Sequence, residues 1–184
     1  MRLPPELALP WRIYQAIYPK DHEAAELFYL AEILPRELAV LRRTHQDLPT
    51  YASTIHTLGQ SIEAPVITAA LLGARRVHLL ATEATAPLVE RLRLLLPHAE
   101  ITHSLILHDE LDAVVQAASQ AAAALPHPLA LDMTGGTKVM AAGMALAAEK
   151  VKADLYYLSG GGKQNPYRRP LPASERLVLV RKNL

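Results

Sequence analysis

The spacing of hydrophobic positions changes along the chain, and from residue 51 onward two patterns alternate. Short apolar runs rich in leucine and β-branched residues indicate strands, and the longer amphipathic or alanine-rich stretches between them indicate helices. The expected strands cover residues 53–58, 76–82, 101–108, 128–133, 153–159 and 175–182, and the expected helices cover residues 61–73, 86–97, 109–125 and 138–150. Ser61 is the expected N-cap of the first of these helices, and Gly73 is expected to end it. Strands separated by crossover helices predict an α/β protein with a Rossmann-like, mainly parallel six-stranded sheet and helices on both faces.

The first fifty residues follow a helical pattern instead. Two helical stretches are expected at residues 21–34 and 35–43, with Asp21 as the N-cap of the first and Pro35 in the first turn of the second. Their apolar positions predict one buried packing face. The sequence therefore predicts two parts: an N-terminal helical arm, residues 1–50, and a Rossmann-like domain, residues 51–184.

Composition narrows the possible functions without identifying one. The 19 lysine and arginine residues nearly balance the 18 aspartate and glutamate residues, so no basic surface indicates long DNA or RNA as a partner. The chain has no cysteine, and its histidines are scattered without metal-ligand spacing, so neither a metal nor another cofactor is expected. No apolar run has the length of a membrane-spanning helix, and the N-terminus lacks a signal-peptide pattern. A cytoplasmic protein that does not contact membranes is therefore expected.

Two loops follow the carboxyl ends of expected strands, where ligands gather in sheets of this kind. Residues 57–61 follow the first strand and residues 134–138 follow the fourth. Adjacent glycines in the second loop let an anion approach backbone amides, and Thr137 and Lys138 add a hydroxyl group and a positive charge. This pattern favours phosphate binding, although neither P-loop nor dinucleotide glycine spacing is present. The alternative is an ordinary turn in which Thr137 caps a helix and Lys138 is a solvated surface residue.

The second loop and its helix, "DMTGGTKVMAAGMAL" at residues 132–146, resemble the signature of CARF domains, the CRISPR-associated Rossmann fold. The first loop and its helix, "TLGQSIEAPVITAALL" at residues 57–72, are similar to the other ligand loop of that family. The resemblance covers about residues 51–184. It implies binding of a cyclic oligoadenylate, cyclic tetra-adenylate (cA4) or hexa-adenylate (cA6), at a homodimer interface in type III CRISPR antiviral signalling. Carried over position by position, it implies ligand contacts from Thr57, Gly59, Gln60, Ser61, Thr134, Gly135, Gly136, Thr137 and Lys138.

CARF proteins often control an attached effector, but no stretch of this chain resembles a metal-dependent nuclease. Arg93 and His98 have the R-x-x-x-x-H spacing of HEPN ribonucleases, yet they lie between a crossover helix and a strand, so the match is interpreted as chance. A CARF domain without an effector suggests a ring nuclease, which cuts its own ligand without a metal through attack of a ribose 2′-hydroxyl. The expected catalytic residues are Lys138, for charge stabilisation, and Ser61, for positioning that hydroxyl, with Thr57 as its substitute.

Two alternatives of other classes stay open. The chain is a non-catalytic sensor or regulatory subunit, with the helical arm contacting a separate effector protein, or it is an unrelated Rossmann-like enzyme that uses a nucleotide or phosphosugar. His56 has two interpretations as well, a base near the ligand or a strand histidine packed in the interior. The loop with Lys163, Gln164, Asn165, Tyr167, Arg168 and Arg169 is either a mobile lid over the ligand or merely a solvated segment.

Overall fold

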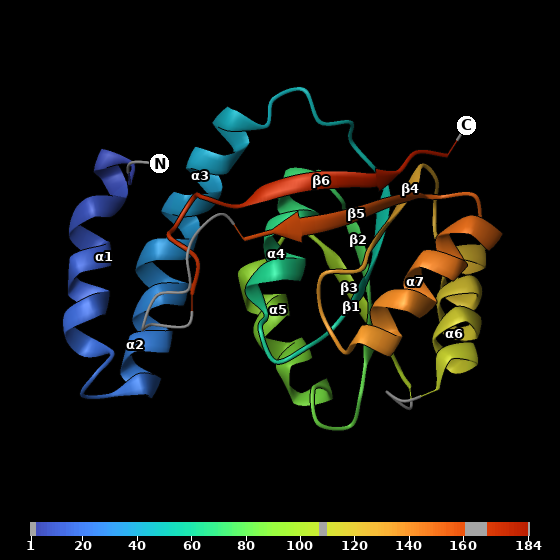
Figure 1. Ribbon diagram of the computed structural model, residues 1–184, viewed down its shortest axis with the longest axis horizontal. Helices are drawn as coiled ribbons and strands as arrows, with labels where there is room; N and C mark the ends of the chain where they lie inside the picture. The colour runs from blue at the N-terminus through green and yellow to red at the C-terminus, as the bar shows by residue number, and fades with distance from the viewer. Residues whose placement is uncertain (1–2, 107–109, 161–168, 184) are drawn as a thin grey trace. The chain divides into compact units, whose positions relative to one another are not determined.

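A computed structural model describes residues 3–106, 110–160 and 169–183 of the chain. The chain divides into two compact units, which are drawn in Figure 1. The first unit contains the described residues of 1–47 and of 159–176, and the second contains residues 48–158 and 177–184 in their described part. Residues 159–176, expected from the sequence to belong to the Rossmann-like domain, group with the N-terminal helices in the structure.

The second unit is built on one six-stranded sheet with the order β3-β2-β1-β4-β5-β6. The strands are β1 (Ser53–Thr57), β2 (Arg76–Ala81), β3 (Glu100–Leu105), β4 (Leu129–Asp132), β5 (Asp154–Ser159) and β6 (Arg176–Arg181). The pairs β1 with β2, β1 with β4, β2 with β3 and β4 with β5 are parallel. Strand β6 runs opposite to β5 (Figure 1), and the backbone N–H of Asn183 accordingly donates to Asp154 at the start of β5, at 2.6 Å. The predicted Rossmann-like, mainly parallel fold is confirmed.

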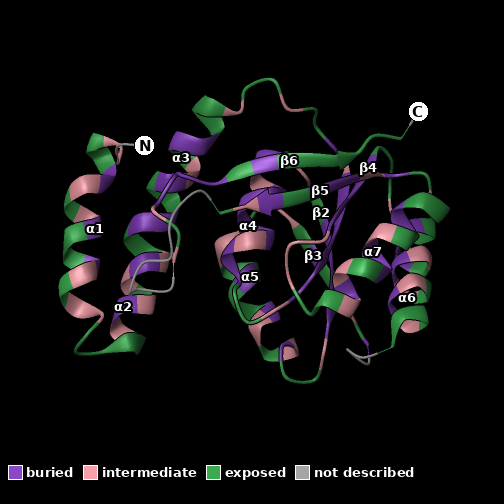
Figure 2. Cartoon of the chain, viewed as in Figure 1, coloured by how far each residue is buried: buried purple, intermediate pink, exposed green. Residues whose placement is uncertain are grey.

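Helices cover both faces of this sheet, α4 and α5 on one side and α6 and α7 on the other (Figure 1). Their bounds are α4 (Glu63–Leu71), η2 (Ala86–Leu88), α5 (Val89–Leu95), α6 (Leu111–Ala124) and α7 (Lys138–Lys150). The central strands are buried (Figure 2), because both of their faces are covered. Ile55 and Leu131, paired across β1 and β4, belong to the core cluster that includes Val114 of α6 and Met144 of α7.

The N-terminal unit contains α1 (Pro5–Ile17), α2 (His22–Phe28), the π-helical turn η1 (Tyr29–Ile33) and α3 (Leu34–Thr44). The carboxylate of Asp21 accepts a hydrogen bond from the N–H of Ala24 at 2.9 Å, so the predicted N-cap is confirmed. Pro35 lies in the first turn of α3, also as predicted. Helix α1 was not predicted, because Pro10 interrupts its pattern. Buried side chains, including Trp11, stabilise this helix although a proline lies inside it.

A buried polar cluster lies among these helices. The carboxylate of Glu37 accepts hydrogen bonds from the hydroxyl of Tyr29 and, at 2.6 Å, from the N–H of Ala173. Burial and the neighbouring Glu37 carboxyl raise the pKa of Glu175 to about 9, so this second carboxyl is protonated at neutral pH. These contacts explain why the segment before β6 groups with the N-terminal helices. No helix in the described part of the chain combines the length and the apolar character that crossing a membrane requires.

Candidate functional site

The two loops singled out in the sequence follow neighbouring strands at the point where the strand order of the sheet reverses. Strand β1 lies between β2 and β4, and the chain leaves β1 for α4 on one face and β4 for α7 on the other (Figure 1). Loops that diverge from adjacent parallel strands leave a crevice outside the carboxyl ends, where open α/β sheets bind ligands. The structure thus brings together residues 57–61 and 134–138 at the topological switch point.

The loops are in direct backbone contact. The hydroxyl of Thr57 donates a hydrogen bond to the carbonyl oxygen of Gly135 at 2.6 Å. A β-carbon on Gly135 would lie 2.1 Å from the carbonyl oxygen of Thr57, and one on Gly59 would lie 2.7 Å from the nitrogen of Gly136. Only residues without a side chain fit at these two positions.

The second loop turns directly into α7. Gly136 has φ +78°, in the left-handed region that favours glycine. The hydroxyl oxygen of Thr137 accepts a hydrogen bond from the N–H of Met140 at 3.2 Å, so Thr137 is the helix cap that the alternative interpretation expected. Lys138 is the first residue of α7 and is exposed, and no hydrogen bond or ion pair engages its ammonium group among the described residues. Its charge and the positive end of the helix dipole therefore act at the same place.

The first loop carries exposed polar side chains above the sheet. Gln60 and Ser61 are both exposed, whereas Glu63, two residues later, is buried. The expectation that Ser61 caps α4 is wrong, because α4 begins at Glu63 with Ile62 at the N-cap position. The hydroxyl of Ser61 donates instead to the carboxylate of Glu63. Its oxygen lone pairs therefore remain available to accept a hydrogen bond.

His56 lies inside the protein beneath this crevice. It is fully buried, with Nδ1 3.0 Å from the carboxylate of Asp132 and Nε2 2.8 Å from the hydroxyl of Thr54. With no exposed surface and both ring nitrogens occupied, His56 does not act as a base toward a ligand. The interpretation as a packed strand histidine is confirmed. Sequence reasoning missed Asp132, although a lone carboxylate at the end of the apolar run "PLALDM" was a signal.

Comparison with known proteins identifies a CRISPR protein as a relative of this chain. No protein-family model matches the chain. The CRISPR system endoribonuclease Csm6 of Thermus thermophilus is 31% identical over 169 residues, which cover 84% of this chain. The chain spans only 35% of the length of that relative.

Among solved structures, Can2 from Sulfobacillus thermosulfidooxidans, in complex with cyclic tetra-adenylate (cA4), matches with a TM-score of 0.54 and 21% identity. That match covers 59% of this chain and 32% of Can2, and it shows a shared fold. Enterococcus italicus Csm6 bound to cyclic hexa-2′-fluoro-hexa-dAMP aligns over 66% of this chain and 35% of its own, with 16% identity and a TM-score of only 0.48. The chain belongs to the CARF family. Both loops singled out in the sequence lie at the switch point of its sheet.

Other sequence candidates lie away from the CARF loops. Arg93, in the last turn of α5, pairs with Glu90 and donates to the carbonyl oxygen of Ile101 at 3.3 Å. These contacts agree with the chance interpretation of the R-x-x-x-x-H spacing. No group of three potential metal-ligating side chains occurs within the described ranges.

The lid interpretation concerned a loop that the structure describes only in part. Residues Lys163, Gln164, Asn165, Tyr167 and Arg168 lie outside the described ranges. The guanidinium of Arg169 pairs with Glu26 and stacks 3.9 Å from the ring centre of Tyr29. Arg169 is thus engaged within the N-terminal unit and does not extend toward a ligand as the lid interpretation expected.

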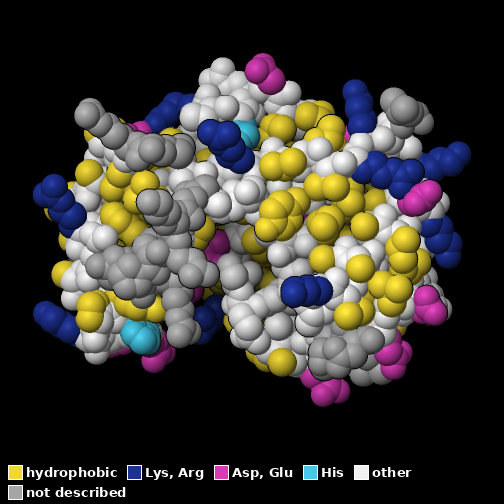
Figure 3. Space-filling model, in the orientation of Figure 1, with side chains coloured by type: hydrophobic (Ala, Val, Ile, Leu, Met, Phe, Trp, Pro, Cys, Tyr) yellow, Lys and Arg dark blue, Asp and Glu magenta, His cyan; other side chains and the backbone are white. Residues whose placement is uncertain are grey.

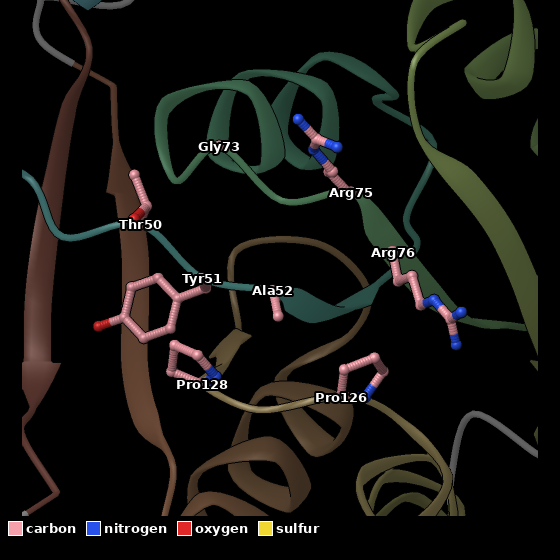
Figure 4. Close-up of a pocket in the computed structure, with 8 residues that line it drawn as sticks. All are labelled: Thr50, Tyr51, Ala52, Gly73, Arg75, Arg76, Pro126 and Pro128. Carbon is pink, nitrogen blue, oxygen red and sulfur yellow. The ribbon is translucent and has the colours of Figure 1, made fainter.

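A pocket of about 410 Å³ lies at the opposite, amino end of the CARF sheet (Figure 4). Thr50, Tyr51, Ala52, Gly73, Arg75, Arg76, Pro126 and Pro128 line it. The side chains of Arg75 and Arg76 extend in opposite directions (Figure 4), and Arg76 pairs with Glu100 at 3.3 Å. Because the two guanidinium groups do not converge, this pocket is a weaker candidate for a phosphate ligand than the switch point.

Proposed function

We propose that this CARF protein binds a cyclic oligoadenylate, cA4 or cA6, at the crevice between its two loops, in type III CRISPR antiviral signalling. The observation that carries the proposal is the junction of the loops at the switch point, where the hydroxyl of Thr57 holds the carbonyl of Gly135. Two further findings support it: the relative is a CRISPR system endoribonuclease, and Can2, which shares the fold, is described in complex with cA4.

The chemistry of the second loop suits a phosphodiester. The N–H groups of Lys138 and Val139 have no acceptor within α7, whereas that of Met140 donates to the hydroxyl of Thr137. The glycines before them leave space for an anion to approach. Lys138 supplies a mobile ammonium group at the same end of the helix. Under this proposal Thr134, Gly135, Gly136, Thr137 and Lys138 contact phosphate and ribose, while Thr57, Gly59, Gln60 and Ser61 line the facing side.

A ring of repeated nucleotides fits a pair of identical subunits, because a two-fold interface presents each donor twice. Hydrophobic side chains gather over β5, β6 and α7 on the face shown in Figure 3. The exposed large apolar side chains of these elements are Leu146, Tyr157, Val178, Leu179 and Val180. Exposed apolar side chains that gather on one face mark an interaction site, so the face shown in Figure 3 supports the proposal that the CARF protein forms a homodimer.

We further propose that the bound ring is cleaved without a metal. The 2′-oxygen of one ribose attacks the adjacent phosphorus, and the bond to the 5′-oxygen of the next nucleotide breaks, leaving a 2′,3′-cyclic phosphate and a 5′-hydroxyl. Ser61 accepts the proton of the attacking hydroxyl as its own proton passes to the carboxylate of Glu63, and water protonates the leaving 5′-oxygen. Lys138 and the amides of Gly136 and Thr137 stabilise the charge on the transferring phosphorus group.

One observation favours the alternative of a non-catalytic sensor. Leu9, Ile13 and Leu27 are exposed on α1 and α2, and such apolar side chains suit contact with a separate effector protein. In that case the ring binds and is not cut. The other alternative, an unrelated enzyme that uses a nucleotide or phosphosugar, loses support because a CRISPR endoribonuclease aligns over most of the chain.

The deciding experiment incubates the purified protein with labelled cA4 and cA6 in the presence of a chelator. Thermal unfolding and titration calorimetry measure binding, and gel analysis of the products measures cleavage. A ligand at a hundred times its dissociation constant adds about 2.7 kcal/mol to the free energy of unfolding. Binding of one ring per two chains with linear products supports the ring nuclease. Binding with intact rings supports the sensor, and no thermal shift with either ring refutes the proposed ligand.

A further inference from the structure

A continuous set of hydrogen bonds leads from the interior of β1 to the glycine turn. His56 and Asp132 are direct neighbours across the parallel strands β1 and β4. The set runs from Thr54 through His56 and Asp132 to Thr134, the residue just before the glycines. Every step joins side chains that the fold buries or half-buries.

His56 and Asp132 form a hydrogen bond with each other inside the sheet. An ionised carboxylate only accepts hydrogen bonds, so Nδ1 of His56 carries a proton and donates to Asp132 at 3.0 Å. Nε2 lies 2.8 Å from the hydroxyl of Thr54, so both ring nitrogens have a hydrogen-bond partner. Buried polar pairs of this kind contribute little net stability compared with apolar residues of the same volume, but they fix geometry when every partner is satisfied.

The other carboxylate oxygen of Asp132 holds Thr134 in place through two hydrogen bonds. It accepts hydrogen bonds from the N–H of Thr134, at 3.0 Å, and from the hydroxyl of the same residue. The oxygen of that hydroxyl in turn accepts the N–H of Leu158 in β5, at 2.7 Å. Both the backbone and the side chain of Thr134 are therefore fixed to the ends of strands. The turn that follows has no regular secondary structure to hold it until α7 begins.

We infer that His56 and Asp132 are positioning residues for the ligand turn. Through Thr134 they hold the glycines and Lys138 in the arrangement that receives a phosphodiester. Because His56 also directly precedes Thr57, whose hydroxyl holds the carbonyl of Gly135, the same pair supports both loops. Neither residue touches the ligand, and this role rests on the proposed binding of a cyclic oligoadenylate at the turn.

The CARF sheet contains a matched control for His56. His78 in β2 is also buried, and both of its ring nitrogens contact hydroxyls, Thr102 at 2.8 Å and Ser104 at 3.0 Å. Those partners lie on β3, away from the glycine turn. Replacing either histidine by leucine removes a buried polar ring and its two hydrogen bonds. Only the replacement of His56 removes a hydrogen bond to Asp132, the residue that holds Thr134 at the start of the glycine turn.

The test compares His56→Leu with His78→Leu by thermal unfolding and by titration with cA4 and cA6. Both variants are expected to melt at a lower temperature. The affinity for the ring should fall roughly tenfold or more in His56→Leu, by analogy with residues that orient the ligands of a metal, and change less than about twofold in His78→Leu. Equal losses of affinity in the two variants, or no loss in either, would overturn the inference. If wild-type protein binds neither ring, the proposed function fails, and the inference fails with it.

A second pair of variants covers the case in which His56→Leu does not fold. Asp132 is buried and is not among the proposed ligand contacts, and Asp132→Asn keeps the shape of its side chain while replacing one acceptor oxygen by an N–H donor. Asp154→Asn makes the same change at the start of β5, where the partners are Tyr51 and Asn183. The Asp132→Asn variant should bind the ring roughly tenfold more weakly, and the Asp154→Asn variant should bind as wild type does. Equal binding by both variants would overturn the inference independently of the histidines.

Discussion

The hydroxyl of Thr57 and the carbonyl oxygen of Gly135 are 2.6 Å apart, although 78 residues of sequence separate them. This hydrogen bond joins the two CARF loops, so its removal tests whether the loops act as one site. Thr57→Val should weaken ring binding, with a small loss of stability of about 1 kcal/mol. Thr57→Ser keeps the hydroxyl and should bind normally. Calorimetric titration measures both variants, and equal affinities would mean that the bond does not shape the site.

Lys138 is expected to contribute a direct phosphate contact. A hydrogen bond to a charged group is worth about 1.5–3 kcal/mol, so Lys138→Ala should weaken ring binding roughly 10- to 100-fold. Any cleavage should fall together with binding, because a phosphate contact serves both the ground state and the transition state. Lys150→Ala, at the other end of α7, is the matched control and should bind as wild type does. Equal effects of the two variants would indicate only a loss of overall charge.

Ser61 separates catalysis from binding if the ring nuclease proposal holds. Ser61→Ala should lower the cleavage rate on the order of a hundredfold and leave ring affinity nearly unchanged, because its role is to move and position a proton. Glu63→Gln should have a similar effect, since the Ser61 hydroxyl donates to that carboxylate. Ser119→Ala, which removes a hydroxyl bonded to its own helix, is the control. Single-turnover assays with cA4 and cA6 measure the rate; unchanged cleavage in Ser61→Ala would remove Ser61 from the mechanism.

Gly135 tests the contact between the loop backbones. An added β-carbon would lie 2.1 Å from the carbonyl oxygen of Thr57, so Gly135→Ala should force the loops apart at a cost of about 1–3 kcal/mol. Ring binding should be lost as well. Gly143→Ala is the matched control, because its β-carbon would lie 2.7 Å from Val114 in the packing of α6 against α7. That variant should be destabilised comparably and still bind the ring; denaturant titration and calorimetry together distinguish the two.

The raised pKa of Glu175 predicts that the stability of the N-terminal unit depends on pH. Because folding raises the pKa of this carboxyl from 4.5 to about 9, the folded state keeps a proton that the unfolded chain releases. The contribution of Glu175 to stability is therefore largest at low pH. It falls as the pH rises from 4.5 toward 9, by at most about 1.4 kcal/mol per pH unit.

Glu175→Gln keeps a neutral polar side chain and should remove this slope, so the variant should become increasingly more stable than wild type above pH 5. Trp11 is the single tryptophan of the chain and lies in this unit, so its fluorescence reports urea unfolding there. Glu23→Gln, at an exposed position of α2, is the control and should leave the slope unchanged. If the free energy of unfolding changed with pH in the same way in wild type and in Glu175→Gln, the raised pKa of Glu175 would be contradicted.

Local pattern was sufficient to predict the elements of the CARF sheet. Strand β1 and helix α7 follow their hydrophobic patterns because buried strands and alanine-rich helices have distinct periods, and Gly73, at φ +64°, ends α4 as expected. Asp21 was predicted as a cap because capping is a contact over three residues. Ser61 was wrongly predicted as a cap because the sequence around it is compatible with two hydrogen bonds. A serine just before a helix can accept from a backbone N–H of the first turn or, as here, donate to the carboxylate of Glu63.

Contacts between distant residues required the tertiary structure. The sequence by itself determined the fold class and the two glycine-containing loops, because periodicity and glycine content are local properties. Only the fold decided that these loops touch, that His56 is fixed between Thr54 and Asp132, and that residues near 173 pack with the N-terminal helices. Each of these contacts depends on strand order or side-chain burial, and a linear chain does not reveal which segments, far apart along it, become neighbours.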